Sequence, residues 1–237
     1  MRCQIRSPSG QSCWDLSAYT FEEVPGNEMV YPDRKWVKWD EHEWLMKSRP
    51  CAICEIAGYQ LAQTLDLPLQ PWLAFYRSTG ADRRGTPNHL GVLIERWAAA
   101  KFDCHIIEPS GTHQELVAKA LALAVFNRDD WPSWLMNQSG SELRIFDLEF
   151  VGPMPTWPPQ YTHFHFYRSS TASALDDAHK EAAEAGILDV FLRHLQTLVD
   201  LDISSVLAFG GHPNAEALER FIVFGIQLRQ RRLRQLL

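Results

Sequence analysis

The sequence predicts a mixed α+β molecule with two lobes, and two observations support this fold class. Segments with strand character crowd the first hundred or so residues, where bulky and basic residues alternate in Lys35-Trp36-Val37-Lys38-Trp39. Patterns of helical period dominate the remainder, with helices expected over 171–184, 187–200 and 214–236. Strands and helices that segregate along a chain are typical of α+β folds. We therefore expect a smaller N-terminal lobe over 1–94 and a larger, mostly helical lobe over 95–237.

The remaining elements follow from local patterns along the chain. Strands and turns are expected over 1–40, and Pro50 opens an expected helix over 51–65 that ends before Pro68. Apolar runs bounded by turn residues predict buried strands over 72–76 and 91–97. A Leu- and Ala-rich segment predicts a helix over 112–126. A loop is expected over 127–134 and a short strand over 143–147.

Composition excludes several classes of protein. Apolar residues make up 46% and charged residues 22% of the 237 residues, which excludes a chain that is mainly disordered. The net charge of −6 argues against a protein that works by coating nucleic acid. The five cysteines form no disulfide framework, the first residues hold no apolar run, and no segment is apolar enough for a membrane span. We expect a cytoplasmic protein without a membrane partner.

The first half offers residues suited to holding phosphates. Lys38 lies on an expected strand, and Glu55 lies in the helix that follows it. An ion pair between a strand lysine and a helix glutamate orients the lysine on nucleotide phosphates in kinases. Ahead of them, the small-residue turn Ser9-Gly10-Gln11-Ser12 could expose main-chain N–H groups to phosphate.

The second half offers two acidic residues at a suggestive spacing. Asp129 follows the end of an expected helix, and Asp147 ends the expected strand about eighteen residues later. Phosphotransferases place a hydroxyl-activating aspartate and a metal-holding aspartate in this order. The apolar residues before Asp147 favour a buried strand that delivers the carboxylate to a site.

These segments together resemble the HipA-like kinases, in particular their short single-domain members. The resemblance covers most of the chain. It is carried by the lysine strand, the glutamate helix with its Leu-Pro ending, the loop with its aspartate strand, and an Arg-rich closing helix. The corresponding residues are Trp36–Trp39, Glu55–Leu69, Phe126–Trp134 with Ile145–Asp147, and Leu228–Leu237.

The resemblance implies a two-lobed protein-kinase-like fold and a role for each candidate residue. Lys38 would contact the α- and β-phosphates of ATP and pair with Glu55, Asp129 would be the catalytic aspartate, and Asp147 would hold Mg²⁺. The turn formed by Ser9, Gly10, Gln11 and Ser12 would lie over the phosphates. The strand that ends at Glu95 and Arg96 would pass beside the adenine and offer main-chain hydrogen bonds.

One position departs from the family pattern. Trp134 stands where the family has an asparagine that binds a second metal, and an indole is no ligand for Mg²⁺, which prefers hard oxygen. Asn137, Asp130 and Asn127 are the candidate substitutes. Three functions stay open: an ATP- and Mg²⁺-dependent kinase of Ser or Thr hydroxyls, a pseudokinase that regulates a partner, and a kinase of a small molecule or peptide natural product.

Other motifs are explained without a separate activity. Cys51 and Cys54 form a CxxC without a second ligand pair, which favours two core thiols over a metal or redox site. His163 and His165 are two residues apart and are expected to be satisfied by local hydrogen bonds or to line an acceptor site. The glycine turn Phe209–Pro213 reads as a helix start. The chain has no nucleophile elbow, dinucleotide fingerprint or Walker motif.

Overall fold

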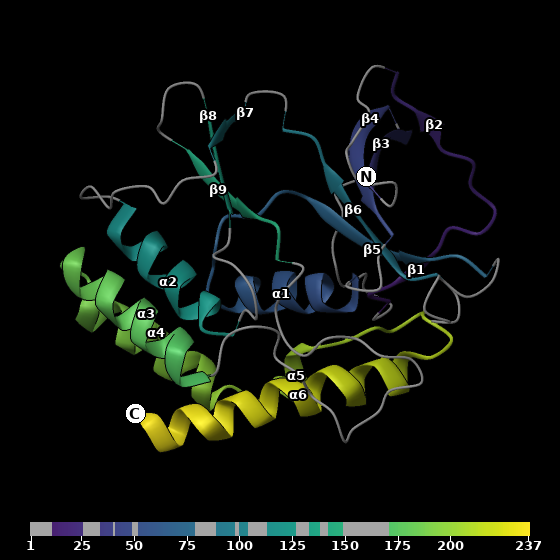
Figure 1. The fold of residues 1–237 in the computed structure, drawn as a ribbon. Coiled ribbons are helices and arrows are strands. Elements are labelled where there is room, and N and C mark those ends of the chain that lie inside the picture. The colour runs from purple at the N-terminus through teal and green to yellow at the C-terminus, as the bar shows by residue number, and fades with distance from the viewer. Residues whose placement is uncertain are drawn as a thin grey trace.

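The computed structural model describes residues 11–25, 34–39, 41–48, 52–78, 89–97, 100–103, 113–126, 133–137, 142–148 and 171–237. Within them, strands and helices form two sheets and a group of helices (Figure 1). The strands are β1 (Trp14–Asp15), β2 (Glu22–Glu23), β3 (Arg34–Trp39), β4 (His42–Lys47), β5 (Trp72–Tyr76), β6 (Gly91–Glu95), β7 (Ala100–Asp103), β8 (Ser133–Asn137) and β9 (Leu143–Phe146). The helices are α1 (Ala52–Thr64), α2 (Gln114–Ala124), α3 (Thr171–Glu184), α4 (Leu188–Asp200), α5 (Ile203–Val206) and α6 (Ala215–Leu236). The mixed α+β class predicted from the sequence is confirmed.

The larger sheet has six strands in the order β1-β5-β6-β4-β3-β2. All neighbours are antiparallel except β1 and β5, which pair parallel. Helix α1 connects β4 to β5, and β6 separates these two strands in the sheet. The end of β4 lies close to the start of α1 in the sequence, and the two also meet in space through Lys47 and Glu55.

Alternate residues of the larger sheet face two different apolar clusters, as strand geometry requires. Val37, Trp44, Met46, Phe75 and Leu93 pack together on one face. Their neighbours on the other face, including Trp72, Ala74, Val92 and Ile94, pack against α1. Leu45 contacts this second cluster as well, so the face of β4 that carries Leu45 and Lys47 is the face that α1 covers.

Helix α1 is buried around almost its whole circumference. Every residue from Ala52 to Ala62 is buried, whereas a surface helix exposes a polar stripe. The helix ends in a Schellman motif, in which Asp66 donates to Gln63 (3.0 Å), Leu67 donates to Ala62 (3.0 Å), and Asp66 has a φ of 51°. A helix buried in this way has a fixed position relative to the sheet.

The smaller sheet has the order β7-β8-β9, and helices α2 to α6 pack beside and below α1 (Figure 1). One continuous apolar cluster includes residues of α1, α2, β9, α3, α4 and α6. Gln60 of α1 also exchanges two hydrogen bonds with the main chain of Ala208, in the α5–α6 connection, at 2.8 and 3.1 Å. The division into lobes at residue 94 stays a prediction.

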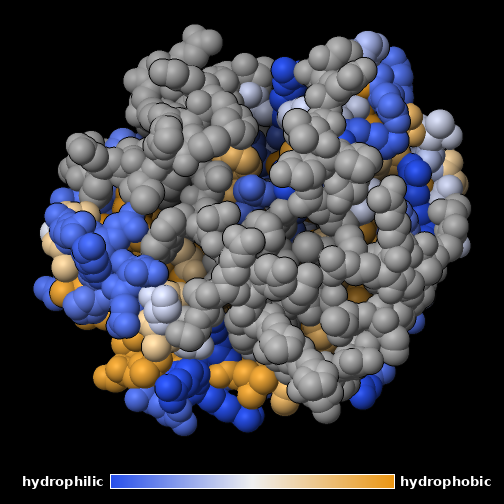
Figure 2. Space-filling model, in the orientation of Figure 1, coloured by the Kyte–Doolittle hydropathy of each residue, from blue (hydrophilic) through white to orange (hydrophobic). Residues whose placement is uncertain are grey.

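The outer helices have the amphipathic pattern of surface helices. In α3, Leu175, Ala178 and Ala182 face the core, while Asp177 and Lys180 are exposed. Figure 2 shows the hydrophilic surface that such residues form on the side where α3 lies in Figure 1. Among the described residues, no helix combines the length and the apolar character of a membrane span.

The structure differs from the predicted elements in two places that bear on the site. Strand β4 was not predicted and stands between β3 and α1. The loop expected over 127–134 ends earlier, because β8 begins at Ser133 and pairs Trp134 with Ile145. Trp134 therefore lies on a strand of the smaller sheet.

Candidate active site

The buried lysine of the larger sheet is Lys47, the last residue of β4. Its side chain is only 2% exposed, and its Nζ donates to Oε1 of Glu55 at 2.8 Å and to Oδ1 of Asp147 at 2.8 Å. Burial of an ammonium group is costly unless carboxylates pair with it. The two ion pairs supply this compensation and join three segments that are far apart in the sequence.

Glu55 belongs to the first turn of α1, and its side chain is 1% exposed. A carboxylate in the first helical turn is favoured by the helix dipole. Because α1 is buried on all sides and is tied to Ala208 through Gln60, the Glu55 carboxylate is held against the end of β4. The position of the Lys47–Glu55 ion pair therefore depends on the packing of α1 and on its hydrogen bonds to Ala208.

Asp147 follows the last residue of β9 and has a φ of 62°, a left-handed conformation that few residues other than glycine adopt. Strand β9 is tied to the α1–β5 connection by a hydrogen bond from the Ile145 N–H to the Pro68 carbonyl (2.8 Å) and by a bridge between Ile145 and Leu69. Strained backbone of this kind concentrates at functional sites. The Asp147 side chain is 29% exposed and so is accessible to solvent.

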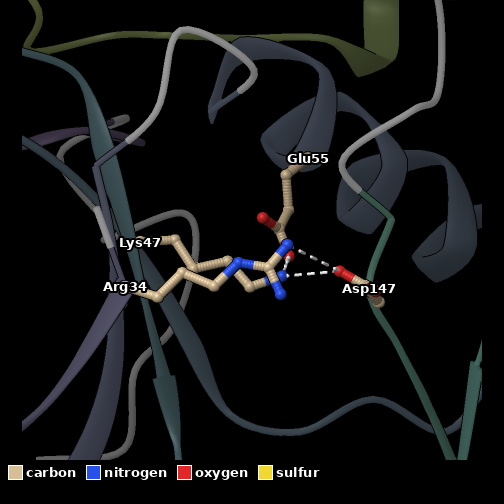
Figure 3. Close-up of polar contacts among 4 residues, drawn as sticks. All are labelled: Arg34, Lys47, Glu55 and Asp147. Carbon is tan, nitrogen blue, oxygen red and sulfur yellow. Dashed lines mark hydrogen bonds and ion pairs between the residues drawn. The ribbon is translucent and has the colours of Figure 1, made fainter. Parts of the chain in front are cut away.

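A fourth charged residue joins the cluster. Arg34, the first residue of β3, places Nη2 4.0 Å from Oδ1 of Asp147 (Figure 3). Figure 3 shows the side chains of Arg34 and Lys47 extending side by side from the sheet, with Glu55 reaching down from α1 and Asp147 facing them. The site thus combines two cations with two carboxylates. The Glu55 carboxylate is buried, and the Asp147 carboxylate is accessible.

This arrangement suits a polyphosphate ligand with a divalent cation. Lys47 is oriented by Glu55, and Asp147 offers hard carboxylate oxygens at the accessible side. No group of three or more metal-ligating side chains occurs in the described part of the chain. Mg²⁺ does not require one, because it is commonly bound by one or two carboxylates together with waters and substrate phosphates.

The prediction of Lys38 as the partner of Glu55 is wrong. Lys38 lies on β3, is exposed, and stands opposite Glu43 on β4. The position opposite Lys47 is Arg34, four residues away along β3, which corresponds to about 13 Å at the rise of a strand. Lys38 is on the strand before β4, and β4, which was not predicted, carries the lysine that pairs with Glu55.

The predicted phosphate turn is also in the wrong place where the structure describes it. The N–H groups of Ser12 and Cys13 donate to the carbonyl of Gly210 at 2.9 and 2.7 Å, and Gln11 donates its side-chain amide to Cys13. This segment leads into β1, at the opposite edge of the sheet from β2 and β3. Gln11 and Ser12 therefore pack against the chain before α6.

Glu95 and Arg96 lie at the end of β6 with most of their polar groups engaged. The Glu95 N–H donates to the Pro71 carbonyl (2.9 Å) and the Arg96 N–H to the Glu43 carbonyl (2.8 Å). Their side chains pair with His42 and Glu43 on β4. The two N–H groups are thus already used within the fold, and the position of this strand end beside adenine stays a prediction.

Several predicted residues lie outside the described part of the chain. They are Ser9, Gly10, Asp129, the alternative ligands Asn127 and Asp130, and the histidines His163 and His165. Asn137 and Trp134 are placed on β8 by their main chain only. Cys54 is buried in α1, as expected for a core thiol.

Comparison with known proteins gives a structural likeness without a match in sequence. No family model and no curated protein matches the sequence. Among solved structures, a Helicobacter pylori proinflammatory kinase, CtkA, is similar over 92% of this chain and 94% of its own, with a TM-score of 0.51 and 10% identity. The fold is kinase-like.

At this identity the likeness concerns the fold alone. The kinase-like fold nevertheless agrees with the site, because protein kinases pair a strand lysine with a helix glutamate and hold Mg²⁺ with an aspartate that follows a strand. Glu55 and Asp147 were predicted for one site, and the structure brings them together at Lys47. Lys47 and Arg34 were missed. The available signal was the position of Lys47 eight residues before Glu55, directly ahead of the helix.

Proposed function

We propose that this chain is an ATP- and Mg²⁺-dependent phosphotransferase that transfers the γ-phosphoryl group to a hydroxyl. The observation that carries the proposal is the buried Lys47, hydrogen-bonded at 2.8 Å to both Glu55 and Asp147, in a kinase-like fold. Nucleotide would bind between an N-terminal lobe over 1–94 and a C-terminal lobe over 95–237. The cytoplasmic location expected from the sequence belongs to this proposal.

In this function Lys47 replaces Lys38 as the residue that contacts the α- and β-phosphates. Glu55 keeps the Lys47 ammonium extended toward the ligand, and its own burial keeps water from competing for that ammonium. Binding in this geometry lowers the barrier by positioning and by charge neutralisation, because phosphoryl transfer asks little covalent chemistry of the protein.

Asp147 would hold the metal through its accessible carboxylate. When bound, Mg²⁺ supplies charge neutralisation at the phosphate oxygens. Asp129 is proposed, from the sequence, to accept the proton of the attacking hydroxyl. The acceptor oxygen then bonds to the γ-phosphorus as the bond to the bridging oxygen breaks, and ADP leaves.

The test is ATP binding by the full chain, measured as the shift in thermal unfolding with and without Mg²⁺. A ligand that binds only the folded state raises its stability by about 2.7 kcal/mol at a hundred times the Kd. We expect Lys47→Met to abolish the shift and Asp147→Asn to remove its dependence on Mg²⁺, while Lys38→Met retains both. If the natural chain shows no shift at several millimolar ATP, the proposal is wrong.

The second candidate is a nucleotide-binding pseudokinase, which is favoured by Trp134. The HipA-like pattern has a metal-binding asparagine at this position, and here a tryptophan lies on β8. Incubation with γ-labelled ATP and a mixture of protein and peptide acceptors separates the two candidates. Binding without transfer, and no effect of Asp129→Asn, would favour the pseudokinase.

A further inference from the structure

We propose that Arg34 is a second phosphate-binding cation, so that Arg34 and Lys47 together hold the phosphate chain of the nucleotide. The inference rests on the proposed function and deepens it, because it makes recognition depend on the number of phosphates. No pattern in the sequence marks Arg34 for this role.

The register of the sheet places the two cations face to face. Strands β3 and β4 are antiparallel, and Arg34 is directly opposite Lys47. Both side chains lie on the face that α1 covers, because the neighbouring pair on this face is Trp36 and Leu45, and Leu45 packs against the α1 cluster. Two like charges directly opposite each other on one face destabilise a sheet unless an anion lies between or beside them.

Asp147 is the anion toward which both side chains point. Lys47 is hydrogen-bonded to Oδ1 of Asp147 at 2.8 Å, whereas Arg34 approaches the same oxygen only to 4.0 Å, within ion-pair but beyond hydrogen-bond distance (Figure 3). One carboxylate oxygen thus faces two cations from two strands. The Arg34 side chain is 15% exposed, and the Asp147 side chain beside it is 29% exposed, so the pair borders the accessible side of the site.

A phosphate chain suits two cations that extend side by side (Figure 3). It carries several negative charges and spans more than one oxygen site. A guanidinium group offers a planar fork of N–H donors that matches phosphate oxygens, while a lysine acts as a point charge. The buried Lys47 and the more accessible Arg34 would contact successive phosphates of one ligand.

The experiment measures the affinity of the full chain for ATP, ADP, AMP and adenosine in the presence of Mg²⁺. The natural protein is compared with Arg34→Gln, Arg34→Lys and Lys35→Gln. Lys35 is the matched control, because it is the next residue of β3, lies on the opposite face and pairs with Glu23. Thermal unfolding without ligand establishes that each variant is folded.

We expect Arg34→Gln to weaken ATP binding about 10- to 100-fold, the range of a hydrogen bond to a charged group. The loss of affinity caused by Arg34→Gln becomes smaller from ATP through ADP to AMP, and this variant binds adenosine as tightly as the natural protein does. Arg34→Lys loses less, because it keeps the charge but not the fork, and it decides the question if Arg34→Gln does not fold. Lys35→Gln leaves the whole series unchanged.

Three results would overturn the inference, and they are distinguishable. If Arg34→Gln matches Lys35→Gln for every ligand while Lys47→Met loses ATP, the inference fails and the proposed function stands. If Arg34→Gln weakens adenosine as much as ATP, Arg34 has a structural role only. If the natural chain binds no nucleotide, the proposed function and the inference fail together.

Discussion

The buried pair of Lys47 and Glu55 makes a sharp prediction about stability. Both side chains are almost fully buried, at 2% and 1% exposure. Removing one partner of a buried ion pair typically costs about 3–5 kcal/mol, because the remaining charge loses its compensation in a medium of low polarity. We therefore expect Lys47→Met to lower the free energy of unfolding by about 3–5 kcal/mol.

The two partners are not equivalent, and this asymmetry can be measured. Lys47 also bonds Asp147, so in Glu55→Gln the lysine keeps the Asp147 carboxylate as a partner, and we expect a smaller loss of about 1–3 kcal/mol. In Lys47→Met, by contrast, Glu55 loses the ammonium while it stays buried. The double variant Lys47→Met/Glu55→Gln removes both charges, and we expect it to be more stable than Lys47→Met alone.

The assay is urea unfolding of the four proteins at one pH, evaluated as a double-mutant cycle. Lys38→Met is the matched control, because it removes an exposed lysine from the neighbouring strand and should change stability by less than about 0.5 kcal/mol. If Lys47→Met costs no more than Lys38→Met, or if the cycle shows no coupling, the reasoning about the buried pair is refuted.

Three further predictions concern other parts of the fold. Gln60→Leu removes both hydrogen bonds to the main chain of Ala208, so we expect urea unfolding to show a loss of about 1–3 kcal/mol, against almost none for Gln63→Leu at the exposed C-terminal end of α1. Gly211→Ala should lower the melting temperature strongly, because φ is +95° and a Cβ would collide with the main-chain oxygen of Cys13; an unchanged melting temperature would contradict this. Burial, and then the charge of a neighbouring glutamate, raise the pKa of Glu181 in the folded state, so its ionisation costs stability as pH rises. We expect Glu181→Gln to stabilise the protein at pH 7 and this gain to disappear near pH 4, and a gain independent of pH would be evidence against the stated cause.

The helices could be predicted well because their patterns are local. Helices α3, α4 and α6 were expected within one or two residues of their bounds, since their apolar residues repeat with helical period on one face. Helix α1 was expected from apolar residues at roughly helical spacing and from its flanking prolines, although every residue from Ala52 to Ala62 is buried. Strand β4 was missed because its two faces meet different surroundings: Trp44 and Met46 face an apolar cluster, and Lys47 places a charge where the alternating pattern requires an apolar residue.

The same local view explains which site residues were found. Glu55 and Asp147 were recognisable because each stands at the end or start of a well-marked element. The choice between Lys38 and Lys47 depended on strand order, for which the local sequence gives only the short distance from Lys47 to the helix. The phosphate-binding role of Ser12 was assigned wrongly for a related reason. The composition of its segment indicates a turn, but its hydrogen bond to Gly210 joins residues that are 198 positions apart in the sequence.

The position of Asp147 depends on α1 as much as on its own sheet. Strand β9 reaches the α1–β5 connection through Ile145, which bonds Pro68, and through Arg144, which donates to Gln70 at 3.0 Å. Since α1 also carries Glu55, both carboxylates that bond Lys47 depend on contacts of α1 or of the connection that follows it. This arrangement favours a site that is preorganised for its ligand, because both carboxylates already lie within hydrogen-bond distance of the Lys47 ammonium.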